Sequence, residues 1–402
     1  MPGTEKFGKE ELKEVLDVMH TGILFRYNHE VQRKNIWKAK DFEEEVKKIT
    51  GAKYALAVSS GSAGILAALA SVGIGYGDEV IVPPFTFVAT IEAVLFLGAI
   101  PVFAEIDETL CLSADGIENA ITPRTKAVCL VHMCGGMADM DSLLPVIKKH
   151  QLILVEDAGQ AFAASYNGTC VGLFGAAGSY SFDFFKIATA GEGGVLVTND
   201  EHTYKMAEYF CDHGHNHEGN NRGMEPHPVI GFNFRISELH AAVGLAQTRR
   251  VPEIKTINQK HKKYLQNAIR NEVNEISFSY VPDESGDSAT FLNLMLPDTQ
   301  SAKLFVDALN KKSIGGFNYW YTNMYHFINQ WDHFKNLRSP HKMAIHYLPI
   351  PQDYHHLELP KSQQVIGRLV SFGIRVSWTE EEMNKLAHEI ISILKDVLVK
   401  VK

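Results

Sequence analysis

A lysine set among apolar side chains is the first feature of this sequence that could do chemistry. Lys186 lies in the stretch SYSFDFFKIATAGEGG, where Phe184 and Phe185 precede it and Ile187 follows it. Apolar neighbours would lower the pKa of the amine and make it a better nucleophile and base, although such a lysine can also extend past them into water. Ser181 comes five residues earlier and could hydrogen-bond a phosphate, and the glycines of GEGG would let the backbone pass close to a ligand.

Two other polar motifs come directly after apolar runs. The stretch SSGSAG, residues 59–64, joins a strand to a helix, so the amides of Gly61 and Ser62 would open that helix where an anion is favoured. The same stretch is also compatible with an ordinary serine-capped helix start. Asp157 ends the apolar strand of LILVEDAGQAF, where a protonated ring nitrogen would suit its carboxylate. The alternative is an aspartate that caps the next helix.

An aromatic residue and a polar turn add to these signals. Phe87, in PPFTFVAT, follows a strand and could stack on a flat cofactor ring or be an ordinary core residue. Asn233 and Arg235 lie on a short turn before a helix in GFNFRISELHAAVGLAQ. Arg235 could bind a carboxylate through two parallel hydrogen bonds, or it could form a surface salt bridge.

The elements that must position these residues alternate between strand and helix from residue 54 onward. The strands are continuous apolar runs such as DEVIVPP and KAVCLVHM, which predict a mainly parallel sheet covered by helices on both faces. Ligands of such sheets bind at the C-terminal ends of the strands, where the motifs above lie. We predict an α/β fold with a large domain over residues 1–250, which includes N-terminal helices, and a small C-terminal α/β domain over residues 251–402. The small domain should start with a long linking helix and contain a strand over the stretch IRVSWT, residues 374–379.

Composition excludes several classes of protein. The 402 residues are 45% hydrophobic and carry a net charge of −8, which argues against a general nucleic-acid surface. Five cysteines without C-x-x-C spacing predict no disulfide framework and a reducing compartment. The N-terminal stretch lacks the apolar core of a signal peptide, and no apolar run is long enough to span a bilayer. We therefore expect a cytoplasmic enzyme with neither nucleic acid nor membrane as its partner.

The order and spacing of these motifs resemble the DegT/DnrJ/EryC1/StrS family of sugar aminotransferases, which belongs to the aspartate aminotransferase-like (fold type I) enzymes that use pyridoxal 5'-phosphate. The resemblance is carried by SSGSAG, VEDAGQAF, SFDFFK with GEGG and TND, and GFNFRISELHAAVGLAQ, and it is strongest over residues 51–250. It implies a catalytic pair and a set of cofactor-binding residues. They are Lys186 as the Schiff-base lysine, Asp157 beside the ring nitrogen, Phe87 stacked on the ring, Gln160 near the ring 3-hydroxyl, Gly61, Ser62 and Ser181 around the phosphate, and Asn233 reaching the phosphate from the neighbouring subunit.

The resemblance also implies a reaction and an assembly. The amino donor would be L-glutamate, the acceptor a carbonyl sugar, and the enzyme a homodimer with shared active sites. Family members that carry histidine in place of the lysine are dehydratases, so the presence of Lys186 favours transamination. A pyridoxal phosphate-dependent sugar dehydratase and a non-catalytic regulator are the alternatives.

Three further stretches bear on the acceptor. VHMCGGMADM, GILFRYN and CDHGHNHEGNNRG resemble a subgroup that aminates carbon eight of 3-deoxy-manno-octulosonate, giving the 8-amino sugar for lipopolysaccharide. Arg26, Arg222 or Arg235 would then bind the carboxylate of this acidic sugar. Nucleotide-linked keto-sugars and inososes are the alternative acceptors.

The histidine run HGHNH, residues 213–217, would place its three histidines on one face if it were extended. No acidic or cysteine companion lies at a telling spacing. We therefore predict a polar loop, with His215 near the mouth of the substrate site, and no metal.

Overall fold

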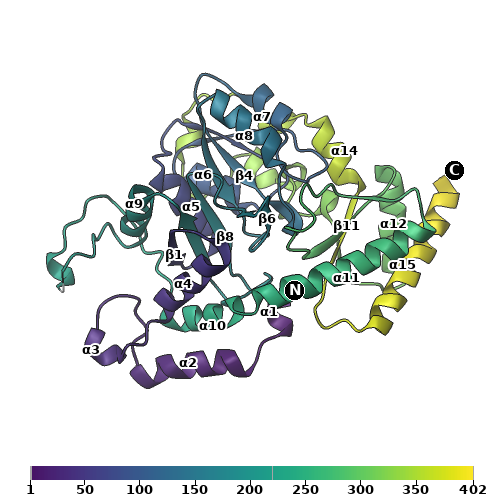
Figure 1. The fold of residues 1–402 in the computed structure, drawn as a ribbon. Coiled ribbons are helices and arrows are strands. Elements are labelled where there is room, and N and C mark those ends of the chain that lie inside the picture. The colour runs from purple at the N-terminus through teal and green to yellow at the C-terminus, as the bar shows by residue number, and fades with distance from the viewer. Residues whose placement is uncertain (1, 220, 402) are drawn as a thin grey trace.

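The fold is built around a large sheet with helices on both faces (Figure 1). The structure is a computed structural model, and it describes residues 2–219 and 221–401. Within these residues the large sheet has seven strands in the order β1-β9-β8-β5-β4-β2-β3. The strands are β1 (Tyr54–Val58), β2 (Glu79–Val82), β3 (Ile100–Phe103), β4 (Thr125–Val131), β5 (Ile153–Asp157), β8 (Ala177–Ser181) and β9 (Gly194–Thr198).

The sheet is mainly parallel, as the continuous apolar runs predict. β3, β2, β4, β5 and β8 pair in parallel, and β9 pairs antiparallel with both β8 and β1. β1 therefore runs in the same direction as the parallel strands. Because of this arrangement, the C-terminal ends of β1, β2, β4, β5 and β8 meet at one edge of the sheet.

Helices from residues 2–248 cover the two faces of this sheet. One face packs against α5, α6 and α9, and the other against α4, α7, α8 and α10, with buried apolar side chains from each helix in the respective cores. The N-terminal helix α2 lies on α10, where Gln247 Nε2 donates to Glu11 Oε1 over 2.7 Å. The helices are α1 (Pro2–Glu5), α2 (Lys9–Thr21), α3 (Glu30–Arg33), α4 (Lys38–Thr50), α5 (Gly61–Ser71), α6 (Ala89–Phe96), α7 (Ala114–Ala120), α8 (Met140–Lys149), α9 (Glu201–Cys211) and α10 (Glu238–Thr248).

A second, antiparallel sheet forms after the long helix α11 (Val251–Glu272). In the described part of the chain it has four strands in the order β10-β11-β13-β12, and helices α12 and α15 pack on it around a core of its own. The elements are β10 (Ser277–Phe278), β11 (Phe291–Met295), α12 (Thr299–Lys311), β12 (Phe317–Tyr319), β13 (Leu369–Gly373) and α15 (Glu380–Val401).

The strand predicted at residues 374–379 is wrong, because the strand lies just before it. β13 (Leu369–Gly373) pairs with β11 on one side and β12 on the other, and its apolar side chains are buried in two cores, Leu369 in the large one and Val370 and Phe372 in that of the second sheet. Ile374 N still donates to Thr290 O over 2.9 Å, the next position in register with β11, and the chain leaves the sheet after this residue.

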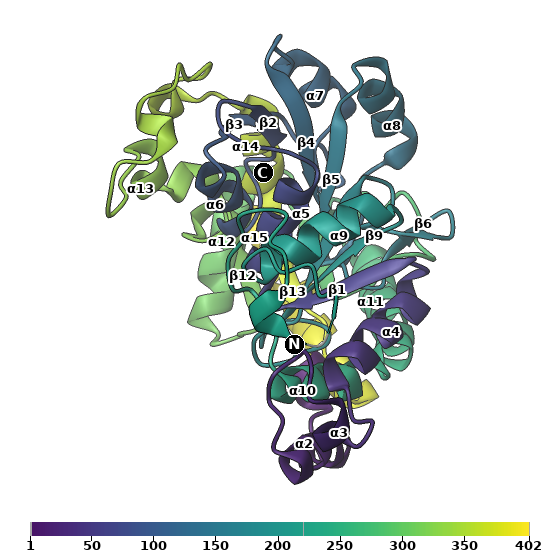
Figure 2. The same ribbon diagram turned by 90° about the vertical axis from the view of Figure 1, so that its left-hand side faces the viewer.

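Between β12 and β13 the chain returns to the large sheet in irregular turns and short helices. Phe327 and Trp331 are buried in the same apolar core as strands β2 and β4. Figure 2 shows this segment, with α13 (Asp332–Lys335) and α14 (Pro360–Arg368), on the side of the molecule that carries β2 and β3. The C-terminal region thus contributes to the large core, and a domain boundary near residue 250 stays a prediction.

Candidate active site

A cavity of about 820 Å³ lies at the edge of the large sheet where the parallel strands end. One side of the cavity, called the floor below, is formed by the segments that follow β1, β2, β5 and β8. The opposite side, called the C-terminal wall, is formed by residues between 316 and 326 and by residues 373–375. All the predicted cofactor-site residues that were expected from the same chain line this cavity. They are Gly61, Ser62, Phe87, Asp157, Gln160, Ser181 and Lys186.

The turn after β1 passes so close to Ser181 that position 61 has room for glycine alone. Ser60 caps α5 by accepting a hydrogen bond from Ala63 N over 3.0 Å. A Cβ atom on Gly61 would lie 2.7 Å from the Cβ of Ser181, so any larger residue would push the two segments apart. The helix N-terminus and the Ser181 hydroxyl therefore face one small space, which suits a phosphate group.

Asp157 ends β5 with both carboxylate oxygens fixed. Oδ2 accepts from Thr90 Oγ1 over 2.7 Å, and Oδ1 accepts from Gly159 N over 3.0 Å. A Cβ on Gly159 would lie 3.0 Å from Oδ1, so this glycine also allows a close approach. Because the two donors hold the carboxylate in one orientation, it can present a fixed negative charge to a protonated ring nitrogen.

Lys186 lies in the loop after β8 with its amine unpaired. Burial lowers the pKa of Lys186, and the charges of Asp183 and Asp157 oppose that effect. No hydrogen bond or ion pair within the described residues engages its Nζ. The loop itself is fixed, since Lys186 N donates to Asp183 O over 3.1 Å and Ala190 N donates to Phe182 O over 2.7 Å.

The phenylalanines next to Lys186 do not enclose it as the sequence suggests. Phe184 and Phe185 are 54% and 63% exposed, although Phe185 lines the rim of the cavity, whereas Ile187 is buried and also lines it. Burial of the amine comes instead from the surrounding walls, because adjacent side chains of an irregular loop point in different directions.

Phe87 and Gln160 line the same cavity as Lys186. The Phe87 ring is half-exposed to the cavity, with the Tyr325 ring nearly parallel to it at a centroid distance of 6.4 Å. Gln160 Oε1 accepts a hydrogen bond from Cys134 N over 3.1 Å, which orients its amide. The cavity thus offers a planar ring both an aromatic face for stacking and a polar amide for hydrogen bonding.

Five other predicted residues lie outside the cavity lining of their own chain. Arg222 and Arg235 both pair with the buried Asp212. Burial would raise the pKa of Asp212, but the hydrogen bond from Arg222 and the charge of Arg235 lower it overall. The remaining three are Arg26, buried and paired with Glu43; His215, with Nδ1 3.0 Å from Glu225 Oε2; and Asn233, exposed, with Oδ1 accepting from Arg235 N. Their roles toward the substrate or the partner subunit stay predictions.

The C-terminal wall contains functional candidates that the sequence motifs did not indicate. His326 lines the cavity, and its Nδ1 lies 2.9 Å from Asn323 Oδ1. Burial and the charge of Lys186 lower the pKa of His326 to about 4, so its ring is neutral at pH 7. Asn318 and Arg375 line the same wall. The aromatic run NYWYTNMYHF was a possible signal, but no spacing rule connects it to Lys186.

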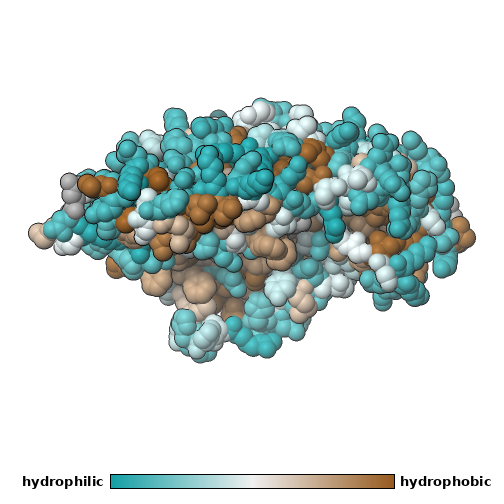
Figure 3. All heavy atoms as spheres, turned by 90° about the horizontal axis from the view of Figure 1, so that it is seen from below, coloured by the Kyte–Doolittle hydropathy of each residue, from teal (hydrophilic) through white to brown (hydrophobic). Residues whose placement is uncertain are grey.

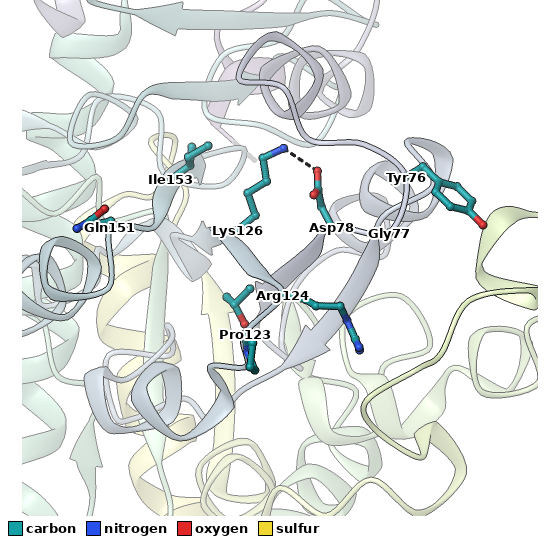
Figure 4. Close-up of a pocket in the computed structure, with 9 residues that line it drawn as sticks. Tyr76, Gly77, Asp78, Pro123, Arg124, Lys126, Gln151 and Ile153 are labelled. Carbon is teal, nitrogen blue, oxygen red and sulfur yellow. Dashed lines mark hydrogen bonds and ion pairs between the residues drawn. The ribbon is translucent and has the colours of Figure 1, made fainter.

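A second hollow of about 570 Å³ lies at the opposite edge of the sheet, where the strands begin (Figure 4). Its cationic groups are already paired. Lys126 Nζ lies 2.8 Å from Asp78 Oδ2, and Arg124 Nε donates to Glu79 Oε1 over 2.8 Å. Because both of its cationic lining residues are held by carboxylates, this hollow does not compete with the cavity around Lys186. Among the described residues no group of histidine, cysteine, aspartate or glutamate is arranged to hold a metal ion, and all five cysteines are free and buried.

The cavity has the parts that a pyridoxal phosphate enzyme needs. It combines an unpaired amine with a lowered pKa, an oriented carboxylate, an aromatic face and a phosphate-sized cradle at a helix N-terminus. Fold and site together define a fold type I enzyme with pyridoxal 5'-phosphate as cofactor.

Comparison with known proteins gives the family. The sequence profile of the DegT/DnrJ/EryC1/StrS aminotransferase family matches residues 6–391, and the chain belongs to this family. The spore coat polysaccharide biosynthesis protein SpsC of Bacillus subtilis is 30% identical over 404 residues, which cover 96% of this chain and 95% of SpsC. GDP-perosamine synthase of Caulobacter vibrioides is 39% identical over 219 residues, which cover 53% of this chain and 57% of the synthase. The chain thus aligns with only about half the length of some curated relatives.

Solved structures agree with the fold. An aminotransferase from Psychrobacter cryohalolentis superposes with a TM-score of 0.81 at 26% identity, covering 98% of each chain. 3-Amino-5-hydroxybenzoic acid synthase superposes with a TM-score of 0.80 at 25% identity, covering 97% of each chain. These neighbours confirm the predicted fold class. No helix within residues 2–219 or 221–401 is long and apolar enough to cross a membrane.

Proposed function

We propose that this protein transfers the amino group of L-glutamate to a carbonyl carbon of a sugar. The observation that carries the proposal is the unpaired amine of Lys186, which faces the same cavity as the carboxylate of Asp157 and the cradle between Gly61 and Ser181. A lysine that served only as a surface charge would have no reason to share a cavity with these groups.

Each residue of the site has a distinct task. When bound, pyridoxal 5'-phosphate supplies an electron sink that stabilises negative charge on the substrate carbon. The amides at the start of α5 and the Ser181 hydroxyl would hold its phosphate, and Asp157 would keep a proton on its ring nitrogen. Lys186 Nζ would take the proton from the α-carbon of the donor and return it as an acid. The lowered pKa of Lys186 favours the neutral amine that this step requires.

The acceptor that we propose to test first is the 8-aldehyde of 3-deoxy-manno-octulosonate, which would yield the 8-amino sugar of lipopolysaccharide. Nucleotide-linked keto-sugars are the second candidate, because the names of GDP-perosamine synthase and of UDP-N-acetyl-3-dehydro-alpha-D-glucosamine 3-aminotransferase point to such substrates in those relatives. Inososes are the third, because a relative from Micromonospora echinospora is named for an inosose.

A single-turnover experiment tests the reaction class. The enzyme loaded with pyridoxal phosphate is mixed with L-glutamate alone, and both the cofactor spectrum and 2-oxoglutarate are measured. A transaminase converts the cofactor to its pyridoxamine form and releases one 2-oxoglutarate per site. A dehydratase would consume a hydroxylated sugar without either change. The pyridoxamine form is then offered the three acceptor classes in turn, and the return of the original spectrum identifies the acceptor.

We also propose that the enzyme is a homodimer in which Asn233 enters the site of the partner subunit. Asn233 is exposed and lies outside the cavity of its own chain, and the nearby Ile230 and Phe232 are 96% and 62% exposed. More exposed apolar side chains lie on α2, at Leu12 and Met19. The face that contains α2, seen from below in Figure 3, gathers brown apolar groups between polar margins. Such surfaces are typical of interfaces.

Hybrid dimers test this assembly directly. Lys186→Ala and Asn233→Ala subunits are unfolded together and refolded as a mixture. If sites are shared, a hybrid contains one site with both Lys186 and Asn233 intact, and the mixture exceeds the activity of either variant alone. A mixture no more active than its parents, or a monomer in light scattering, would refute the shared site.

A further inference from the structure

We propose that Asp183 is a positioning residue that acts through Lys186, because its carboxylate supplies the negative charge that the Lys186 ammonium needs while this amine carries a proton. The inference rests on the proposed function and adds to the same site a residue without an assigned role. Asp183 lies in the loop after β8, three residues before Lys186, and both residues line the cavity.

The Asp183 carboxylate is fixed by its own loop. Its Oδ1 accepts from Phe185 N over 2.9 Å, and its carbonyl accepts from Lys186 N over 3.1 Å, so one tight turn holds both residues. At the start of this turn Asp183 N donates to Ser181 Oγ over 3.4 Å, which leaves the hydroxyl hydrogen of Ser181 for a phosphate. The carboxylate therefore keeps a set position relative to the backbone of Lys186.

Asp183 differs from the other carboxylates of the cavity in being uncommitted. It is half-buried, and within the described residues no ion pair engages it. Asp157 is held in one orientation at the end of β5 and would face the ring nitrogen of the cofactor. Glu192 is exposed to water. Asp183 is therefore the carboxylate that stays available to Lys186 once the cofactor is in place.

A lysine that moves a proton has to exist in both charge states. Burial lowers the pKa of Lys186, and the charge of Asp183 opposes this effect more than the charge of Asp157 does. An ammonium formed in this cavity loses hydration, which is costly unless a carboxylate compensates for it. Asp183 offsets part of this cost through space, since the two side chains form no direct ion pair. It thus strengthens Lys186 as a base.

The other titratable groups of the cavity lining do not supply this charge. His326, on the C-terminal wall, has a pKa lowered to about 4 by burial and by the charge of Lys186, so it is neutral at pH 7. Arg375, on the same wall, is a cation. Tyr180 and Tyr325 offer hydroxyl groups and no carboxylate. Removal of the Asp183 charge should therefore be felt at Lys186 without a substitute.

Chemical labelling of Lys186 tests the inference without turnover. The cofactor-free full chain is treated with acetic anhydride over a series of pH values, and mass spectrometry of the Lys186 peptide gives the midpoint pH at which the amine becomes reactive. Asp183→Asn keeps an acceptor for Phe185 N but removes the charge, so we expect the midpoint to fall by roughly 0.5–1 pH unit. Asp183→Glu keeps the charge and should stay closer to wild type. Asp353→Asn is the matched control, since Asp353 Oδ1 accepts from His355 N over 2.9 Å in the same kind of turn, at an exposed position outside the cavity lining.

The half-reaction with L-glutamate should change in the opposite direction. The loaded enzyme is mixed with glutamate that carries hydrogen or deuterium at the α-carbon, at a pH above both labelling midpoints, so that the isotope-sensitive rate reports proton abstraction. We expect this rate to be roughly 3- to 10-fold lower in Asp183→Asn, because a weaker base gains less from taking the proton. The amine thus becomes reactive at lower pH while proton abstraction slows, a combination that a purely structural role of the turn would not produce.

Three results would overturn the inference. They are a labelling midpoint of Asp183→Asn equal to or above that of wild type, an unchanged rate of proton abstraction, and slower labelling together with slower abstraction and a lowered Tm. The proposed function can fail separately. If wild-type Lys186 is labelled but the loaded enzyme never releases 2-oxoglutarate from glutamate, the transaminase proposal fails while the labelling midpoints still decide the role of Asp183.

Discussion

The floor and the C-terminal wall of the cavity are built in different ways. The floor consists of residues at the C-terminal ends of paired strands, such as Gly61, Asp157 and Ser181, and the strand register fixes their relative positions. The wall consists of irregular segments around His326 and Arg375, which the large core and the second sheet bring to the cavity from outside that register. We propose that the floor, fixed by strand register, holds the cofactor, and that the wall contacts the substrate.

The largest effect should come from the floor, at Lys186. Lys186→Ala removes the amine that we propose as the proton-transferring base, and we expect turnover to fall roughly 10³-fold or more. Glutamate half-reactions followed by absorbance measure the loss. Lys205→Ala, at a surface lysine paired with Glu201, should behave as wild type. The assignment would be wrong if borohydride reduction trapped the same lysine adduct in Lys186→Ala as in wild type.

Asp157→Asn should cause the second-largest loss of turnover. The amide oxygen can accept from Gly159 N, and the amide nitrogen can donate to Thr90 Oγ1 in place of the bond it now receives, so the fold should survive while the negative charge is lost. We expect kcat to fall roughly 10²-fold, as when a preorganised electrostatic partner is removed from an active site. Asp141→Asn, at an exposed position, is the control. A variant with full kcat would mean that Asp157 only shapes the floor.

Gly61→Ala separates the packing of the floor from its chemistry. The new Cβ would lie 2.7 Å from Ser181 Cβ, and we expect the overpacking to cost about 1–3 kcal/mol in stability or cofactor affinity. Gly75→Ala is matched to it, since a Cβ there meets nothing within 4 Å and should change stability by less than about 0.5 kcal/mol. Urea unfolding and cofactor titration measure both. Equal effects of the two substitutions would show that the cradle is looser than its geometry indicates.

The floor of the cavity can be predicted from the sequence, and the C-terminal wall cannot. Continuous apolar runs locate the strands, and a polar motif after each strand end then falls on one edge of the sheet, so the floor residues can be anticipated. The wall cannot, because β13 (Leu369–Gly373) and the segment around His326 reach the cavity through long-range packing that has no local period. The misplaced strand at residues 374–379 has the same origin, since LVSFG and IRVSW are both apolar enough and only pairing with β11 and β12 decides between them.

Charge pairing is a further limit of the sequence. Arg26, Arg222 and Arg235 have the residue type that a carboxylate needs, and their spacing gives no sign that Glu43 and Asp212 already occupy them. Arg375 has the same type and an unremarkable context. Only the structure separates a guanidinium that is held by a buried acid from one that faces a cavity.

The smallest expected effect concerns His326 in the C-terminal wall. It is a loss of folding stability that appears only as pH falls. Because burial and the charge of Lys186 lower the pKa of His326 to about 4, the folded protein resists protonating this ring while the unfolded chain takes up the proton near pH 6.5. The folded state therefore loses stability as pH falls from about 6.5 to about 4, and His326 contributes nothing above that window. Partial exposure of the ring reduces the loss to the order of 1–2 kcal/mol.

His326→Asn should lack this component. Urea unfolding of the cofactor-free protein at pH 7, 6, 5 and 4 should give a shallower acid decline for His326→Asn than for wild type. His355→Asn, at an exposed histidine, should follow wild type. In Lys186→Ala the acid decline in stability should lie between those of wild type and His326→Asn, because this substitution removes the repelling charge but leaves the His326 ring buried. Parallel declines in wild type and His326→Asn would show that His326 titrates as it would in water, and that the wall is open to solvent in a way that the floor is not.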